Sequence, residues 1–323
     1  MFKNILLKPF YQLIIMSNIK LIPENIKIAE ETMENDSPII VHNQEGIDFL
    51  SSLSDNSIDL ILTDPPYIIS KESGMNKFEK EVAALDASGK NKKTEEEWIQ
   101  FKAKKGYTDD KYRENYIKYG NTSGNKYAFK TDYGEWDKQF TIEKLQEFIK
   151  LFYKKLRKGG TCIIFFDIWK LETLKRFMET AKTQKTGFKQ IRFIEWVKTN
   201  PMPLNQSRNY LTNCREVALL GVKGGSPTFN SKYDKGIYEF PIQTGKKGER
   251  HPTQKSLRLF EELIKKHSNE GNLVVDPFLG GGTTALACKT TKRRFSGCEV
   301  EKSYYDIIQK KLSDIQKKLS LSE

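Results

Sequence analysis

Hydrophobic and polar positions follow two patterns along this chain, one typical of buried strands and one typical of amphipathic helices. Apolar runs at 38–42, 58–63 and 161–166 have the length of strands covered on both faces. Residues 141–156 repeat apolar positions at helical spacing, with Thr141 as N-cap and Lys158-Gly159-Gly160 as the expected end. Further helices are predicted at 46–53, 171–181, 257–267, from 283 and from 303, and strands at 191–197, 217–222, 273–276 and 295–299. This alternation predicts an α/β fold with a doubly wound, Rossmann-like sheet.

Two polar stretches interrupt the pattern. Residues 70–135 carry 14 basic and 12 acidic residues and one predicted helix near 95–104, which is typical of a mobile insertion. Residues 223–250 are rich in Gly, Lys and Tyr and are expected to be irregular. We therefore expect an N-terminal extension over 1–37 and one catalytic domain over 38–323 that contains both stretches.

Composition narrows the class of protein. With 37% hydrophobic and 30% charged residues among 323, the chain is typical of a soluble globular protein. It has no apolar run near the roughly 20 residues that span a bilayer, and the interrupted N-terminal stretch does not resemble a signal peptide. Four scattered cysteines and three histidines lack zinc-ligand spacing, so we expect reduced thiols, a cytoplasmic location and no metal.

The net charge of +12 is concentrated in one third of the chain. Residues 150–260 hold 23 Lys and Arg against 8 Asp and Glu. A solvated basic surface is one explanation. A polyanionic partner is the other, because phosphate contacts release counterions.

A glycine-rich turn, Asp276-Pro-Phe-Leu-Gly-Gly-Gly-Thr-Thr284, lies between a predicted strand and a predicted helix. A generic connecting loop would explain it, but Glu299 follows Gly280 by 19 residues at the end of the next strand, where nucleotide-binding folds place the acid that holds ribose hydroxyls. Asp276 would repel a pyrophosphate, so a ligand with an ammonium group and an uncharged ribose fits better. Only 24 residues follow Glu299, so the other strands of the sheet must come from upstream, in a circularly permuted order.

The tetrad Asp64-Pro65-Pro66-Tyr67 directly follows a predicted strand and therefore lies at the carboxyl edge of the sheet. A strand-ending turn is the simpler explanation. The alternative is methylation of a conjugated amino nitrogen. The Asp64 carboxylate and the Pro65 carbonyl would accept both amino protons and direct the lone pair toward a methyl donor. Tyr67 would offer a ring face to a base swung out of the duplex.

These segments resemble the β-class DNA amino-methyltransferases, which act on adenine N6 or cytosine N4. The tetrad precedes the glycine turn, and His251-Pro-Thr-Gln-Lys255, Gly134-Glu-Trp-Asp137 and Trp196-Val-Lys-Thr-Asn-Pro201 resemble further family segments. Gly281, Ser256 and Gln44-Glu45 depart from the family pattern, and a cofactor contact by Glu45 is the weakest inference.

The resemblance implies a site-specific methyltransferase acting on N6 of adenine in duplex DNA, with base flipping and S-adenosylmethionine as cofactor. It implies that the tetrad is catalytic. The implied cofactor-binding residues are Asp64, Thr253, Gln254, Lys255, Asp276, Pro277, Phe278, Gly280, Gly282, Thr283 and Glu299.

The same resemblance places target recognition between the 217–222 strand and His251, and the insertion is expected to share this task. Candidate DNA contacts are Arg208, Lys223, Lys232, Lys246, Lys247 and Arg250, with Asn205 and Gln206 beside them. A cognate restriction endonuclease is an implied partner. The sequence does not decide between a monomer and a homodimer, and it does not give the recognition sequence.

Four other functions compete. Asp64 favours adenine, but cytosine N4 remains the nearest alternative. An RNA or protein-amide methyltransferase would carry Asn first in the tetrad and an upstream cofactor motif. A DNA-binding module that has lost its catalysis would have damaged motifs, and a dehydrogenase would need a hydride-transfer site.

Overall fold

The computed structural model describes residues 37–67, 82–124, 140–201, 213–243 and 254–320. The predicted N-terminal extension lies, except for its last residue, outside these ranges, so its expectation stays untested. Within them, no helix has the length and apolar character needed to cross a membrane. No group of three or more His, Cys, Asp or Glu side chains in these ranges is arranged to hold a metal ion.

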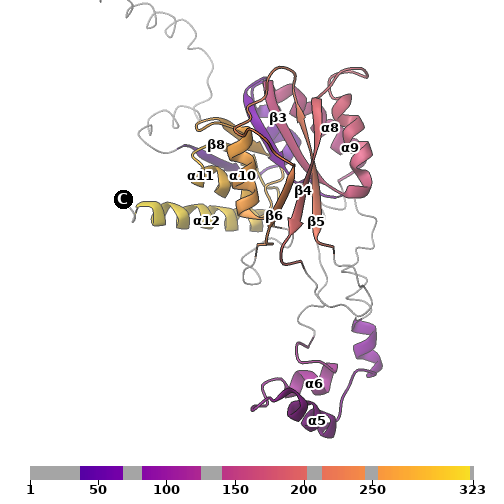
Figure 1. The fold of residues 1–323 in the computed structure, drawn as a ribbon. Coiled ribbons are helices and arrows are strands. Elements are labelled where there is room, and N and C mark those ends of the chain that lie inside the picture. The colour runs from indigo at the N-terminus through magenta and orange to yellow at the C-terminus, as the bar shows by residue number, and fades with distance from the viewer. Residues whose placement is uncertain (1–36, 68–81, 125–139, 202–212, 244–253, 321–323) are drawn as a thin grey trace, which may run out of the picture.

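One eight-stranded mixed sheet organises the fold (Figure 1). Its order is β1-β8-β7-β2-β3-β5-β4-β6. The strands are β1 (Ile39–His42), β2 (Ile58–Thr63), β3 (Leu156–Phe166), β4 (Lys189–Lys198), β5 (Arg215–Val222), β6 (Ile237–Phe240), β7 (Leu273–Asp276) and β8 (Arg294–Cys298). The five strands from β1 to β3 in this order are parallel, whereas β5 runs antiparallel to both β3 and β4.

The strand pairings confirm the Rossmann-like α/β sheet and its permuted order. Strand β7, which leads into the glycine turn, pairs with β2 on one side and β8 on the other, although β2 lies far upstream in sequence. The carboxyl ends of β2, β3, β4, β6, β7 and β8 therefore meet at one edge of the sheet, together with the start of the antiparallel β5. We call this the site edge.

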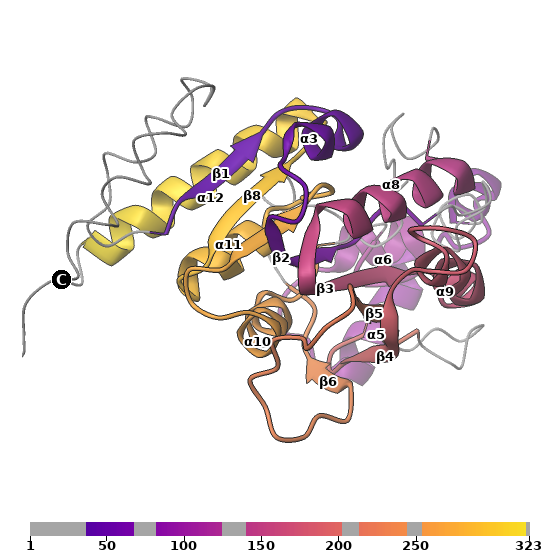
Figure 2. The ribbon, with the colours of Figure 1, turned by 90° about the horizontal axis from the view of Figure 1, so that it is seen from above.

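Two helical layers cover the sheet, as Figure 2 shows. On one face pack α3 (Gly46–Ser52), α8 (Ile142–Lys155) and α9 (Leu171–Glu179), whose apolar stripes join one core cluster. On the other pack α10 (Leu257–His267), α11 (Thr283–Thr290) and α12 (Lys302–Ser320), which join a second. Strand β2 contributes alternate side chains to both clusters, so all of its residues except Asp59 are buried.

The structure corrects one predicted boundary. Helix α8 ends at Lys155, and the following Lys158-Gly159-Gly160 belongs to β3 rather than to a helix end. Gly159 has φ of +79°, and a Cβ there would lie 2.4 Å from the carbonyl oxygen of Ser226. The glycine is needed for this close backbone approach inside the sheet, not to end the helix.

Both polar stretches contain more regular structure than predicted. The 223–250 segment includes β6, which pairs parallel with β4. The described part of the insertion forms α5 (Glu95–Lys105) and α6 (Arg113–Tyr119), together at a distance from the sheet (Figure 1). The side chains of Trp98, Phe101 and Tyr116 pack between them, with 4.3 Å between the ring centroids of Phe101 and Tyr116. The sequence pattern does not predict this small cluster, because its aromatic residues are widely spaced among many charged residues.

Candidate active site

The Asp64-Pro65-Pro66-Tyr67 tetrad begins where β2 ends. Pro65 has no backbone N–H for a further ladder bond, so the chain leaves the sheet at Asp64, at the site edge. The Tyr67 ring packs edge-on against Phe166 at the end of the neighbouring strand, with centroids 5.8 Å apart. The tetrad is thus anchored by β2 and β3 together.

The Asp276 carboxylate joins the tetrad to the glycine turn. It is 2% exposed and accepts hydrogen bonds from the hydroxyl of Thr63 at 2.6 Å, the N–H of Phe278 at 3.0 Å and the hydroxyl of Thr284 at 2.5 Å. Burial raises the pKa of Asp276 to about 6, against the effect of these three donors. Because Thr63 directly precedes Asp64, this carboxylate fixes the two motifs relative to each other.

Glu299 closes the turn from the end of β8. One of its oxygens accepts the N–H of Gly280 at 2.7 Å, and the other accepts the N–H of Glu301 at 2.8 Å. Burial raises the pKa of Glu299 to about 7, despite these two donors. Gly282, with φ of +87°, then turns the chain into α11.

The tetrad and the glycine turn line one cavity of about 330 Å³. Of the predicted site residues, it contains Asp64, Pro65, Pro66, Tyr67, Gln254, Lys255, Asp276, Pro277, Phe278, Gly280, Thr283 and Glu299. Thr253 lies outside the described residues. Five carboxyl groups and two ammonium groups line the cavity, an acidic balance that suits a positively charged small molecule.

An aromatic wall bounds the cavity beside the glycine turn. The ring centroid of Phe278 lies 4.5 Å from that of Phe148 and 5.4 Å from that of Phe140. Gly46 faces the same wall, and a Cβ there would lie 2.8 Å from the Phe148 ring and 3.2 Å from the carbonyl oxygen of Pro277. Because Gly46 has no side chain, the Phe148 ring can pack close to the glycine turn.

Comparison with known proteins agrees with this geometry. Residues 58–310, more than three quarters of the chain, match a family model described as DNA methylase, of the N6/N4 methyltransferase type. The chain belongs to the DNA methylase family. It is 28% identical over 302 residues to the type II methyltransferase M2.DpnII of Streptococcus pneumoniae, covering 86% of this chain and 91% of that protein. It is 26% identical over 287 residues to M.HpaI of Haemophilus parainfluenzae, covering 83% and 72%.

Solved structures resemble this DNA methylase in fold. The M1.HpyAVI–SAM complex has a TM-score of 0.52 and 25% identity, covering 84% of this chain and 98% of that one. The cytosine-N4-specific PvuII DNA methyltransferase has a TM-score of 0.55 at 15% identity, covering 85% and 88%. The second likeness concerns the fold alone.

Two expected cofactor contacts of this DNA methylase also bind charged or polar groups of the protein itself. Glu45 caps α3, where its carboxylate accepts the N–H of Ile47 at 2.5 Å and lies 3.7 Å from the Lys144 ammonium. Lys255, an expected cofactor-binding residue, directs its ammonium to Asp64 at 2.6 Å and Glu216 at 2.7 Å. Both residues line the cavity, but their charged groups already have partners within the protein.

Glu216 is a charged cavity residue that was not predicted from the sequence. It lies at the start of β5, and its carboxylate bridges Lys255 and Lys198. A charged residue at the start of an apolar strand was a visible signal. Its partners Lys198 and Lys255 are brought to it by the pairing of β4 with β5 and by the position of the segment before α10, neither of which the sequence reveals.

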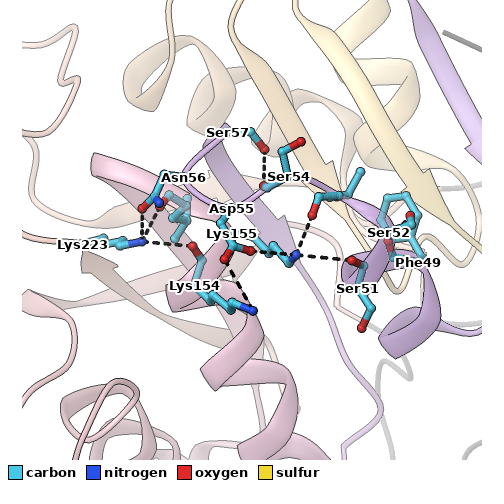
Figure 3. A network of polar contacts seen from close by, with 12 residues as sticks. Phe49, Ser51, Ser52, Ser54, Asp55, Asn56, Ser57, Lys154, Lys155 and Lys223 are labelled. Atoms are coloured by element: carbon cyan, nitrogen blue, oxygen red, sulfur yellow. Dashed lines mark hydrogen bonds and ion pairs between the residues drawn. The ribbon is translucent and has the colours of Figure 1, made fainter. Parts of the chain in front are cut away.

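Lys223 and Lys232, the two predicted DNA contacts within the described residues, both lie away from the site edge. Lys223 lies at the edge opposite the site, where its ammonium donates to Asn56 Oδ1 at 2.7 Å and to the carbonyls of Lys154 and Leu156 at 3.1 and 2.7 Å (Figure 3). Burial lowers its pKa. The structure thus assigns Lys223 to the end of α8, which corrects its expected position on the DNA face.

Lys232 is exposed but also lies away from the site. Its neighbour Asp234 binds Lys266 in the last turn of α10 at 2.7 Å. That helix starts two residues after Lys255 and is about 16 Å long, which separates its last turn from the cavity. Arg208, Lys246, Lys247 and Arg250, with Asn205 and Gln206, lie outside the described residues.

Proposed function

We propose that this chain is a site-specific methyltransferase that transfers the methyl group of S-adenosylmethionine to N6 of adenine in a short duplex DNA sequence, with the base flipped out. One observation carries the proposal: the Asp-Pro-Pro-Tyr tetrad and the glycine-rich turn line the same cavity. A methyl donor and an acceptor amine must meet within one pocket, and this one is lined by both carboxyl groups and aromatic rings.

The acidic lining supports S-adenosylmethionine as the cofactor, because that molecule carries a sulfonium and an ammonium charge. When bound, it supplies an electrophilic methyl group. We assign Glu299 to the ribose hydroxyls, and Asp276, Pro277, Phe278, Gly280, Gly282, Thr283, Thr253 and Gln254 to the remainder of the cofactor. The resemblance to M1.HpyAVI, whose structure was solved as a complex with SAM, supports the same assignment.

The catalytic work falls to residues that hold the target amine. Oδ1 of Asp64 is buried and has no hydrogen-bond partner among the described residues, so it is ready to accept an amino proton. The carbonyl of Pro65 would accept a hydrogen bond from the second amino N–H, and Pro66 stiffens the turn. In the reaction the amino nitrogen would accept the methyl group that the cofactor supplies, and Oδ1 of Asp64 would take up the amino proton that is lost. The Tyr67 ring stacks on the flipped base.

The identity of the methylated base is the direct test. DNA incubated with the protein and S-adenosylmethionine is expected to yield N6-methyladenine on digestion to nucleosides and mass analysis. Asp rather than Ser at position 64 favours adenine. N4-methylcytosine alone would overturn the choice of base, and methylation of RNA alone would overturn DNA as the substrate. Sequencing the methylation pattern in host DNA would give the recognition site.

We predict that the DNA-binding part of the 223–250 segment follows β6. Because β6 runs parallel to β4, the chain after Phe240 continues from the site edge, whereas Lys232 lies near the far end of α10. Replacing Lys246 and Lys247 by Glu should weaken DNA binding. The slope of the logarithm of the binding constant against the logarithm of the salt concentration should become shallower by about two units.

The matched control reverses Lys232 and Lys235, two exposed lysines on either side of Asp234. This pair of changes should leave the salt slope unchanged. Fluorescence anisotropy of a labelled duplex between 50 and 200 mM salt, roughly, measures both variants. Equal slopes for the two double variants would place the DNA contact elsewhere.

A further inference from the structure

The Asp64 carboxylate is asymmetric in its surroundings. Oδ2 lies 2.6 Å from the Lys255 ammonium, whereas the buried Oδ1 accepts no hydrogen bond from any described residue. A carboxylate with one oxygen occupied by a cation presents the other in a defined direction. The residue that fixes the cation therefore also determines which oxygen faces the cavity.

Lys255 is held from two sides. Its side chain is 6% exposed, and its ammonium lies 2.7 Å from the Glu216 carboxylate as well as 2.6 Å from that of Asp64. The rings of Tyr67 and Phe165 flank it, with their centroids at 5.3 and 5.7 Å. The ammonium is thus confined between two carboxylates and two rings.

A second lysine extends the arrangement behind Glu216. The Lys198 ammonium lies 2.7 Å from the other oxygen of Glu216, so charges alternate from Asp64 through Lys255 and Glu216 to Lys198. We call these four residues the charge row. They come from the end of β2, the segment before α10, and strands β5 and β4.

The electrostatic effects within the charge row oppose one another. Burial raises the pKa of Asp64, which Lys255 lowers and Glu216 raises further. Burial alone would raise the pKa of Glu216, but Lys255 and Lys198 hold it below its usual value. Burial would lower the pKa of Lys255, but Asp64 and Glu216 hold it well above its usual value. One protonated lysine is therefore shared between two carboxylates.

We propose that Glu216 is a positioning residue for methyl transfer: it holds Lys255 against Oδ2 of Asp64 and shares its charge, leaving Oδ1 to accept the amino proton. This inference rests on the proposed function. It gives Lys255 a role in orienting the tetrad rather than in holding the cofactor, and it gives Glu216 and Lys198 roles in the same reaction.

The test is the pH profile of kcat at saturating cofactor and DNA, because the acid limb reports ionisation of Asp64 in the bound enzyme. Besides the charge row, Tyr67 and Asp276 face this carboxylate. Glu216→Gln removes a negative neighbour, so the acid limb should move to lower pH by roughly 0.5–1 unit, while kcat falls about tenfold through lost orientation. Lys255→Met and Lys198→Met each remove a positive charge, so their acid limbs should move to higher pH.

Three controls separate this role from a purely structural one. Glu262→Gln removes a carboxylate that pairs with Lys266 on α10, and should leave kcat and its pH profile unchanged. Glu216→Asp keeps the charge and should keep the wild-type acid limb with a reduced kcat. In Glu216→Gln, the dissociation constant of S-adenosylhomocysteine should stay within about twofold of wild type.

An acid limb in Glu216→Gln that stays in place, or that moves in the same direction as in Lys255→Met, would overturn the proposal. Should Glu216→Gln fail to fold, Lys198→Met at the end of the charge row tests the same coupling, and an unmoved limb there would overturn it equally. Failure of the proposed function would be seen separately, as absence of DNA methylation by the wild-type protein.

Discussion

Replacing Asp64 by alanine is expected to lower the rate of methyl transfer on the order of 10³-fold, the loss typical when a preorganised polar group is removed from a reacting centre. The amine would lose Oδ1 of Asp64, a buried oxygen that accepts no hydrogen bond from any described residue. Lys255 would still have Glu216 as partner, so the charge row should not collapse. Single-turnover transfer of labelled methyl groups to DNA measures the effect, with cofactor and DNA binding expected to persist.

Two variants control this result. Asp64→Asn keeps an acceptor oxygen and should retain part of the rate. Asp306→Ala removes an exposed carboxylate that pairs with Lys302 on α12, and should leave the rate unchanged. Wild-type methyl transfer by Asp64→Ala would exclude this residue from the mechanism.

Replacing Glu299 by alanine should raise the dissociation constant of S-adenosylmethionine about 100-fold. Hydrogen bonds to a charged acceptor contribute about 1.5–3 kcal/mol each, and the Gly280 N–H would also lose its acceptor. Isothermal titration calorimetry measures the affinity directly. The control is Glu301→Ala, an exposed glutamate two residues away, for which the affinity should stay within about twofold.

The same carboxyl predicts a pH dependence of cofactor binding. Burial raises its pKa to about 7, so below that pH the free protein carries a protonated Glu299. Binding to ribose hydroxyls favours the ionised form, and the wild-type affinity should fall by up to about tenfold for each pH unit below 7. Glu299→Gln cannot titrate and should lose this dependence. An equal pH dependence in both proteins would assign it to another group.

The local elements of the fold were largely predictable. Strands β2 and β7 and helix α10 lie where the hydrophobic pattern predicted them. Each is a single regular element, so the spacing of its apolar residues along the sequence is enough to identify it. The prediction of Lys158-Gly159-Gly160 as a helix end was wrong, because a glycine needed for a tertiary contact looks in sequence like a glycine needed for a cap.

The sequence by itself determined the α/β class, the permuted order and the pairing of tetrad with glycine turn, since each depends on contiguous residues and on the direction in which a strand ends. The tertiary structure alone decided that Lys255 faces Asp64 and Glu216, that Lys223 caps α8, and that the 223–250 segment starts away from the site. These depend on which strands and helices become neighbours across the sheet. Charged side chains pair with groups that are close in the folded structure, and the number of residues between two groups in the sequence does not predict how close they will be.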